Sequence, residues 1–317
     1  MKQRPQFVHK PKPFTPGYLA SIDPLPVRSA SGAVKFVGTF TGLSVEVNDP
    51  EAIKQLALAG CFGQGTRSRS FPASIHTSHV ETVLERQLER RHEWQQKYNF
   101  HSRNESGKEL RVIGEEVEEM LSNGTLHFRE LEEDHAKHEI DPFSVTENLS
   151  LLLEETIFLA EKLNCLEVKS LDGEVLTTDR LLVTFCSLKK NFLSSYVSYL
   201  YLRSKNWIVK SGLKFGGDFL LYKKGPQYFH ASFIVLIQPY QNGQKMSEEE
   251  HYLDNYDFQC FNRIAETTAK ELLILEVHYP TDVDAADPKA CLGQLQHFKV
   301  SETFPKHFNL SVLRSNQ

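Results

Sequence analysis

Two kinds of periodicity follow each other along this chain. Residues 34–47 (VKFVGTFTGLSVEV) alternate between apolar and polar positions, which predicts a β-hairpin. An Asn-Asp-Pro sequence then precedes residues 51–58 and predicts the start of a short helix. The glycines at 60–65 are more typical of turns than of a phosphate cradle, because no Gly-Lys-Ser/Thr sequence follows them. Residues 79–98 carry Glu and Arg at helical spacing and predict a charged helix.

Helical spacing returns in the middle of the chain. Residues 150–166 (SLLLEETIFLAEKLNCL) predict a helix with Leu153, Ile157 and Ala160 on one face and two glutamates near its N-terminus. A shorter helix is expected after Thr178-Asp179. A third helix is predicted over 191–205, aromatic on one side and basic at its C-terminal end.

From Trp207 onward the period changes to that of strands separated by Gly and Gly-Pro turns. The apolar run 233–237 predicts a central strand covered on both faces. Residues 258–269 fit a helix or a strand equally well, whereas 271–277 (ELLILEV) predict a strand. Residues 298–313 close the domain. The whole pattern predicts an α/β (α+β) protein with a mixed C-terminal sheet, preceded by a smaller helical and mixed N-terminal region.

These changes of pattern divide the chain into four parts. Residues 1–72 form an N-terminal arm and a small β/α segment, in which the Pro-rich, basic first thirty residues are expected to be poorly ordered. Residues 73–146 contain the charged helix and an acidic insert or linker. Residues 147–204 form a helical subdomain, and 205–317 form the domain that carries the candidate chemistry.

Composition adds limits to this picture. The 317 residues carry a formal net charge of −5, with 24% charged and 40% hydrophobic residues, which is typical of a soluble globular protein. No apolar run approaches the length of a membrane span, and no secretory signal is recognisable at the N-terminus. The five cysteines are far apart and lack zinc-ligand spacing, which predicts reduced intracellular thiols and no metal site.

The charge is distributed unevenly. Residues 105–161 contain 16 acids and four Lys or Arg, whereas residues 189–224 contain eight Lys or Arg and one acid. A basic stretch in an acidic protein suggests a local anionic partner. A solvated helix face followed by a hairpin turn explains the same pattern without a partner.

The densest cluster of reactive residue types lies near the C-terminal strands. Tyr222 ends one predicted strand, a Lys-Lys-Gly-Pro turn follows, and His230 begins the next strand. Lys270 precedes the strand at 271–277, which can neighbour the strand of His230. Each of these residues alone is more typical of packing or of a solvated strand end. Together they could bring one base, one acid and one cation to one edge of a sheet.

The longer sequences around these residues resemble a known family. Residues 212–237 (GLKFGGDFLLYKKGPQYFHASFIVLI), with YLYLRSKNWIVK before them and RIAETTAKELLILEV after them, are similar to the catalytic domain of the tRNA-intron endonuclease family. Residues 51–70 and 152–166 resemble the branch of that family that cuts the 5′ splice site of precursor tRNA in eukaryotes. The resemblance is strong over about 200–315 and does not cover 73–146.

The resemblance implies a catalytic triad of Tyr222, His230 and Lys270. RNA cleavage by the neighbouring 2′-hydroxyl needs a base, an acid and a positive charge, and the tethered nucleophile needs no metal or other cofactor. Tyr222 is expected to be the base, with a pKa lowered by Lys223, Lys224 and Lys270. His230 is the expected general acid and Lys270 the group that stabilises the charged phosphorane-like state. The implied products are a 2′,3′-cyclic phosphate and a 5′-hydroxyl.

The family also clamps an RNA base at the partner subunit's cleavage site between an Arg and an aromatic residue. Arg263 matches this Arg, and Phe308 takes the place where the family usually has Trp, with Phe304 as the alternative. If the segment of Arg263 is extended, its odd spacing from Lys270 places the two residues on opposite faces.

Partners and location also follow from the resemblance. It implies intron-containing precursor tRNA as substrate, the other splicing-endonuclease subunits of a heterotetramer as partners, and nuclear residence, with a cytoplasmic or mitochondrial-surface location as the alternative. No membrane span and no DNA partner are expected. A non-catalytic RNA-binding or scaffold subunit remains the alternative function, although retention of all three triad residue types argues against it. A winged-helix DNA binder gives no reason for Lys270.

Overall fold

The computed structural model describes residues 25–29, 32–66, 72, 110–112, 125–130, 133–140, 147–226, 228–246, 255–281 and 288–305. The chain divides into two compact units. The first comprises Met1–Val47, Gln55–Gly63 and Leu151–Gln317, and the second comprises Asn48–Lys54 and Gln64–Ser150. We describe each unit by itself. Among the described helices, none is long and apolar enough to cross a bilayer.

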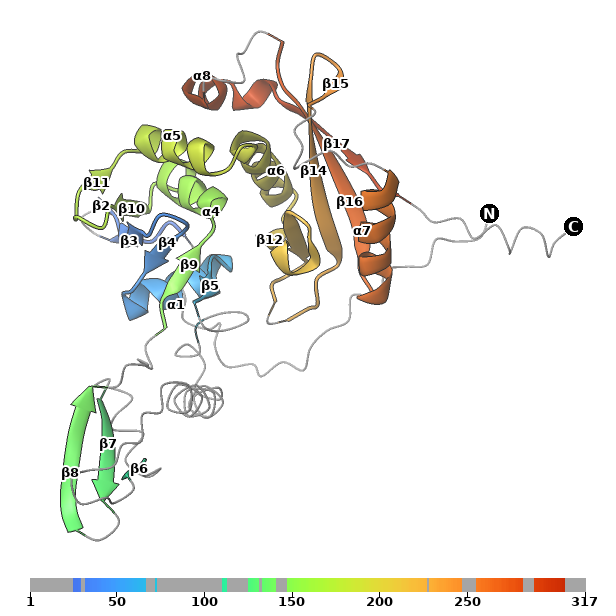
Figure 1. The fold of residues 1–317 in the computed structure, drawn as a ribbon. Helices are drawn as coiled ribbons and strands as arrows, with labels where there is room; N and C mark the ends of the chain where they lie inside the picture. Colours follow the sequence, from blue (N-terminus) through green and yellow to red (C-terminus); the bar gives the residue numbers. More distant parts are fainter. Residues whose placement is uncertain are drawn as a thin grey trace, which may run out of the picture. The chain divides into compact units, whose positions relative to one another are not determined.

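The C-terminal part of the first unit contains a mixed sheet in the order β12-β13-β14-β16-β17 (Figure 1). Only β14 and β16 pair in parallel, and β15 adds an antiparallel edge to β14. The strands are β12 (Ile208–Ser211), β13 (Phe219–Tyr222), β14 (Phe233–Gln241), β15 (Gln244–Lys245), β16 (Glu271–His278) and β17 (Lys299–Thr303). The predicted mixed sheet and its central strand are therefore confirmed.

Helices cover both faces of this sheet. Helix α6 (Phe192–Ser204) contacts β14 and β16 on one face, and helix α7 (Asn255–Thr267) contacts β16 on the other, as Figure 1 shows. The ambiguous segment 258–269 is thus helical through Thr267. One face of the helix packs on the sheet, where Ala265 is buried against Leu220, Ile234 and Leu272.

The N-terminal part of the first unit is a second small sheet with helices. Strands β3 and β4 form the predicted hairpin, closed by the bond from Thr41 N–H to the Ser44 carbonyl (2.9 Å), and β10 pairs in parallel with β3. Further elements complete this part: β1 (Arg28–Ser29), β2 (Gly32–Ala33), β3 (Phe36–Phe40), β4 (Val45–Val47), β10 (Leu166–Lys169), β11 (Val175–Leu176) and α5 (Thr178–Leu188). Two short pieces, α8 (Pro288–Gly293) and the 3₁₀ turn η6 (Leu295–His297), precede β17.

The helix predicted over 150–166 has a different form. Residues 149–151 are the strand β9, α4 spans only Leu153–Ile157, and a π-helical turn, η4 (Phe158–Lys162), follows. The predicted apolar face is wrong in part, because Leu153 and Ala160 are only half-buried while Glu154 and Glu155 are buried. Both glutamates have cationic partners, Lys189 and Lys210, which makes their burial tolerable.

The second unit contains the start of α1 (Pro50–Gly60), where the predicted cap is confirmed by the bond from Ala52 N–H to the Asp49 carboxylate (2.9 Å). Strand β5 (Gln64–Gly65) pairs with β9 (Leu149–Leu151). A three-stranded antiparallel sheet, β6 (Leu110–Val112), β7 (Thr125–Glu130) and β8 (Glu133–Ile140), lies where the sequence predicted only an acidic insert. The predicted helix at 79–98 and most of the N-terminal arm lie outside the described residues.

Candidate active site

Strand register brings Tyr222 and Lys270 to the same end of the C-terminal sheet. The ladders end at the pairs Leu221–Phe233 and Phe233–Glu271. One residue further, Ser232 N–H donates to the Leu221 carbonyl (2.8 Å) and Glu271 N–H donates to the Ser232 carbonyl (2.9 Å). Tyr222, Ser232 and Lys270 therefore continue one row across three strands. The backbones of Tyr222 and Lys270 lie two strand spacings apart, about 10 Å.

The side chains of this row belong to the sheet face that α7 covers. Leu220 and Leu272 are part of an apolar cluster on that face, and side chains two positions away in a strand share a face. Tyr222 packs against the same cluster. The cluster thus supports the candidate base and leaves Lys270 at its margin.

Lys270 is held by two contacts from its own unit. Its ammonium lies 4.1 Å from the centroid of the Phe215 ring and donates to the Thr268 carbonyl at 3.1 Å. Partial burial lowers its pKa, because desolvation disfavours the charged form. A poorly solvated cation of this kind gains more from an approaching phosphate than a fully hydrated one.

Phe215 is a site residue that the sequence interpretation missed. It lies in the 3₁₀ turn η5 (Leu213–Phe215), and Gly216 follows with a φ of 72°, which favours glycine. A Cβ on Gly212 would lie 2.6 Å from the Gly217 carbonyl oxygen, so the turn closes only without that side chain. The Gly-rich sequence therefore folds Phe215 under Lys270. The signal was the aromatic residue within GLKFGG, which the interpretation treated only as part of a strand.

The electrostatics of Tyr222 differ from the prediction. Burial raises its pKa above the ordinary value of 10.0, and no cation offsets this effect. The expected lowering by Lys223, Lys224 and Lys270 is therefore wrong for the chain by itself. Lys223 and Lys224 are exposed, and the ammonium of Lys270 is engaged with Phe215 and Thr268.

His230 lies at the same end of the sheet but not within a strand. It precedes β14 by three residues, so the prediction that it begins the strand is wrong. The predicted Lys-Lys-Gly-Pro turn is present: Gly225 has a φ of 119°, and its carbonyl accepts from Phe229 N–H at 3.1 Å. His230 is exposed, while the next residue, Ala231, is buried in the apolar cluster beside Tyr222. An exposed imidazole next to this cluster is accessible to a substrate.

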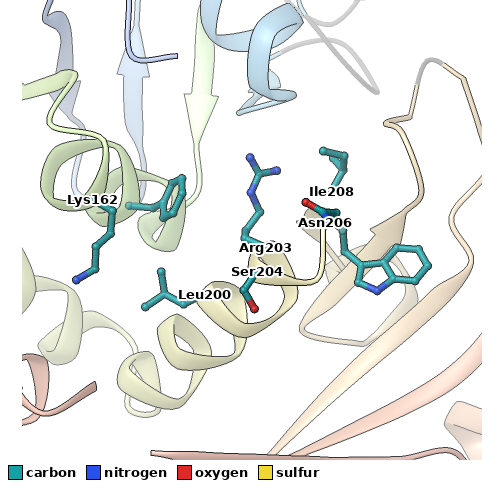
Figure 2. Close-up of a pocket in the computed structure, with 8 residues that line it drawn as sticks. Lys162, Leu200, Arg203, Ser204, Asn206 and Ile208 are labelled. Carbon is teal, nitrogen blue, oxygen red and sulfur yellow. The ribbon is translucent and has the colours of Figure 1, made fainter. Parts of the chain in front are cut away.

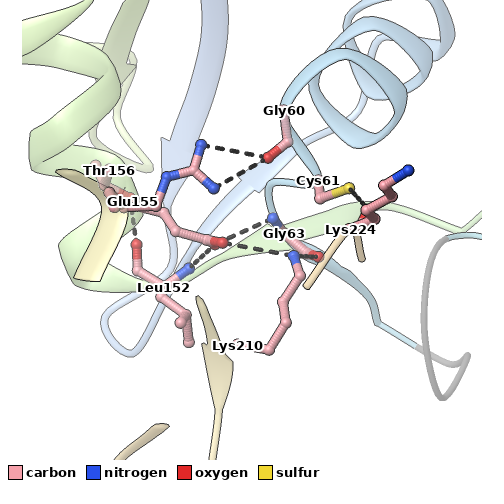
Figure 3. A network of polar contacts seen from close by, with 9 residues as sticks. Gly60, Cys61, Gly63, Leu152, Glu155, Thr156, Lys210 and Lys224 are labelled. Carbon is pink, nitrogen blue, oxygen red and sulfur yellow. Dashed lines mark hydrogen bonds and ion pairs between the residues drawn. The ribbon is translucent and has the colours of Figure 1, made fainter. Parts of the chain in front are cut away.

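A buried polar network joins the segment after α1 to the catalytic sheet (Figure 3). Glu155 Oε2 accepts from Gly63 N–H and Leu152 N–H, both at 3.0 Å, and Lys210 on β12 donates to the Gly63 carbonyl at 2.6 Å. Lys210 Nζ also lies 3.5 Å from Glu155 Oε1. The φ of Gly63 is 68°, which confirms that this glycine serves a turn.

The same segment reaches the turn between Tyr222 and His230. The Cys61 thiol donates to the Lys224 carbonyl at a sulfur–oxygen distance of 3.9 Å, a weak contact that Figure 3 also shows. No local pattern predicts this link, because Cys61 and Lys224 are 163 residues apart. One weak contact thus links this N-terminal segment to the turn that lies between the two candidate proton-transfer groups, Tyr222 and His230.

The predicted clamp residues have different positions. Arg263 is exposed on α7, so the argument that assumed an extended segment is wrong, because the segment is a helix. Phe304 is 46% exposed, and its ring centroid lies 5.9 Å from that of Phe233. Phe308 lies outside the described residues. A clamp role for Arg263 and an aromatic partner stays a prediction.

The arrangement offers proton-transfer groups and cations around one open end of a sheet. Among the described residues, no group of three or more His, Cys, Asp or Glu side chains could hold a metal ion. The set of Tyr, His and Lys side chains can move protons to and from a substrate and can stabilise negative charge.

Comparison with known proteins gives consistent matches to this region. Residues 192–285 match the family model described as tRNA intron endonuclease, catalytic C-terminal domain. That range includes Tyr222, His230, Arg263 and Lys270 but neither Phe304 nor Phe308.

Several characterised proteins are similar to the chain. It is 33% identical over 179 residues to mouse tRNA-splicing endonuclease subunit Sen2, covering 56% of this chain and 38% of the mouse protein. It is 33% identical over 173 residues to subunit Sen2-1 of Arabidopsis thaliana, covering 53% of this chain and 68% of that protein. A tRNA-splicing endonuclease of the archaeon Saccharolobus islandicus is 31% identical over 134 residues, covering 42% and 68%. The chain spans less than half the length of the mouse and chicken relatives.

Proposed function

Because this chain belongs to the tRNA intron endonuclease family, we propose that it is the catalytic subunit of a tRNA-splicing endonuclease and cuts precursor tRNA at the 5′ splice site. The observation that supports this most is the row of Tyr222, Ser232 and Lys270 across three neighbouring strands, with His230 at the same end of the sheet. Retention of these three side chains disfavours the alternative of a purely scaffolding or RNA-binding subunit.

The proposed reaction is an internal transfer at phosphorus. Tyr222 takes the proton of the 2′-hydroxyl, whose oxygen then forms a bond to the neighbouring phosphorus. The bond from phosphorus to the 5′-oxygen breaks, and His230 donates a proton to that oxygen. The products are a 2′,3′-cyclic phosphate and a 5′-hydroxyl, so atoms and charge balance without water or a metal ion. The tethered 2′-hydroxyl supplies the proximity that a metal-bound nucleophile would otherwise provide.

The directions of the two pKa shifts suit this division of roles. Burial raises the pKa of Tyr222, so little phenolate forms at neutral pH, but the phenolate that forms is a stronger base. Burial lowers the pKa of Lys270, and its weakly solvated ammonium favours the additional negative charge of the phosphorane-like state.

The proposal includes partners and a location. The names of the relatives describe subunits, and we propose that this chain works in a heterotetramer with a second cleaving subunit for the 3′ site and in the nucleus. Arg263, exposed on α7, would then contact RNA bound at the partner's site.

The test is cleavage of an intron-containing precursor tRNA by the reconstituted assembly in EDTA. Cleavage at the 5′ exon–intron junction, with the exon ending in a cyclic phosphate, is expected. A 3′-hydroxyl end, or activity that requires added magnesium, contradicts the proposed chemistry.

A further inference from the structure

A cavity of about 540 Å³ opens beside the catalytic sheet and has no role in the reaction described above. It lies between the π-helical turn η4, the C-terminal turn of α6 and the start of β12. Figure 2 shows Lys162 on one side, Asn206 and Ile208 on the other, and Arg203 projecting from α6 between them. All of these residues belong to the first unit.

The lining of this cavity is rich in hydrogen-bond donors and cations. Two of the lining residues are cations, Lys162 and Arg203, and none is acidic. The indole N–H of Trp207 and the carboxamide of Asn206 make no hydrogen bond to other residues in the described part of the chain. Among the described residues, Lys162 pairs with Glu161 alone (2.8 Å), at an exposed position, and an anionic ligand can replace a contact of such low stability. The donor set therefore favours an anion.

Arg203 is held in place by contacts within the first unit. Its guanidinium lies 4.8 Å from the centroid of the Phe62 ring and 5.8 Å from that of Phe158, and two of its nitrogens approach the Gly60 carbonyl at 3.4 and 3.5 Å. A guanidinium has five N–H donors, so donors remain for a ligand. A side chain held in this way loses little conformational freedom on binding.

The C-terminal carbonyls of α6, which would repel an anion, are largely hydrogen-bonded at this cavity. Its last carbonyls already accept from the chain that follows: Asn206 N–H donates to the Arg203 carbonyl (2.9 Å), and Trp207 N–H donates to the Leu202 carbonyl (3.1 Å). Asn206 has a φ of 64°, a left-handed conformation that closes the helix.

The cavity lies at the edge strand of the catalytic sheet. Ile208, on its wall, is the register partner of Tyr222 in the antiparallel pair β12–β13, so these two side chains share one face of the sheet. Trp207, one residue earlier, lies on the opposite face, which α6 covers. Trp207 also extends an aromatic row, since its ring centroid lies 5.5 Å from that of Phe233.

We propose that this cavity binds one unpaired nucleotide of the precursor tRNA. Its phosphate contacts Lys162 and Arg203, and its base packs against Trp207, whose indole is a sequence-tolerant stacking surface. This inference rests on the proposed function for the identity of the RNA. The two cations, the stacking surface of Trp207 and the absence of acids among the lining residues favour RNA over a segment of a partner protein.

The experiment uses the reconstituted assembly and fluorescently labelled precursor tRNA. Binding is measured by anisotropy between 50 and 300 mM salt, and cleavage is measured separately as single-turnover rate and KM. The variants are Lys162→Gln, which removes a cation, and Asn206→Asp, which adds an anion and tolerates the left-handed backbone. Lys169→Gln is the matched control, because Lys169 is 38% exposed and pairs with Glu167 much as Lys162, 41% exposed, pairs with Glu161, but it lies on β10 outside the cavity.

Loss of one phosphate contact reduces the salt slope by about 0.7 and weakens binding about fourfold at 0.15 M salt. We expect this for Lys162→Gln, a similar or larger weakening for Asn206→Asp, an unchanged cleavage rate at saturating RNA, and no effect of Lys169→Gln. Wild-type affinity and slope in both cavity variants would overturn the inference while leaving the proposed function intact. If the variants lose another subunit on size-exclusion chromatography, the cavity is a protein-docking site and the inference is also wrong. If wild-type protein binds but does not cut the RNA, while the cavity variants weaken binding, the nucleotide site stands and the proposed function fails.

Discussion

The ammonium of Lys270 lies 4.1 Å from the centre of the Phe215 ring, over its face. The two residues come from different elements, since Phe215 is in the glycine-closed turn before β13 and Lys270 follows α7. The aromatic ring attracts the cation and fixes the position of a long, flexible side chain. The glycine-rich sequence thus acts on the candidate site through one contact.

The first prediction concerns this contact. Phe215→Leu keeps the apolar packing but removes the ring, so cleavage at the 5′ site should slow by about 2- to 30-fold, the range of a cation–π interaction. Phe215→Tyr should retain most of the activity, because the ring face remains. The measurement is the single-turnover rate at saturating RNA. Equal rates for the Leu variant and the wild type would show that Phe215 does not position Lys270.

The second prediction concerns pH. Below the pKa of Tyr222, which burial raises above 10.0, the ionised fraction grows about tenfold per pH unit. His230 loses its proton as the pH rises while the ionised fraction of Tyr222 grows, so the two effects oppose each other and the wild-type rate should change much less than tenfold per pH unit above neutral pH. The alkaline decline should begin below pH 10.5, because burial lowers the pKa of Lys270 and only its charged form stabilises the phosphate.

The variant His230→Gln makes this test decisive. Without the acid, only the ionisation of Tyr222 remains in the neutral range, so the residual rate should rise about tenfold per pH unit. A level profile in this variant would mean that Tyr222 is not the base.

The third prediction concerns the buried network. Glu155 is 1% exposed, and Glu155→Ala leaves two buried N–H groups and the largely buried Lys210 ammonium without their carboxylate. The free energy of unfolding should fall by about 3–5 kcal/mol in urea denaturation. The control Glu174→Ala breaks the exposed pair with Arg180 (2.7 Å) and should cost less than about 1 kcal/mol. If the two variants lost similar amounts of unfolding free energy, the buried position of Glu155 would not be the cause of its contribution to stability.

The fourth prediction concerns Arg263. Its exposure on α7 leaves it available to RNA at a partner's site, so Arg263→Ala should slow 3′-site cleavage by about 5- to 150-fold and change 5′-site cleavage little. Phe308→Ala should share this phenotype. If Phe304→Ala shares it instead, the aromatic assignment shifts by four residues. Loss of 5′ cleavage in Arg263→Ala would place this residue in its own subunit's site.

Local pattern was sufficient for much of the catalytic sheet. The alternation and the turn residues around Tyr222 predicted β13, β14 and the Lys-Lys-Gly-Pro turn, because both sheet pairing and turn conformation depend on adjacent residues. The fold class followed from the order of these elements. The parallel pairing of β14 with β16, which brings Lys270 beside the row of Tyr222, was available only as a hypothesis.

Other features depend on contacts between distant segments and left no local signal. Residues 258–267 are helical because Ala265 packs on Leu272 and its neighbours, a tertiary contact that decided between two equally good local patterns. Glu155 was interpreted as an ordinary acidic residue in the first turn of a helix. It is in fact buried and contacts Lys210 and Gly63, which are 55 and 92 residues away in the sequence. The pKa of Tyr222 was mispredicted for the same reason, since the apolar cluster around it is assembled from three strands and a helix.

The proposed 5′-site catalytic centre is tested most directly by single-turnover cleavage of one precursor tRNA. The assemblies contain either wild-type protein or His230→Ala, and cleavage at both splice sites is followed in the same reaction. Removal of the general acid should slow 5′-site cleavage by about 10²- to 10⁴-fold. Cleavage at the 3′ site, which another subunit performs in this account, should change far less. Equal loss at both sites in an intact assembly, or an unchanged rate at the 5′ site, would contradict the claim that Tyr222, His230 and Lys270 form the 5′-site catalytic centre.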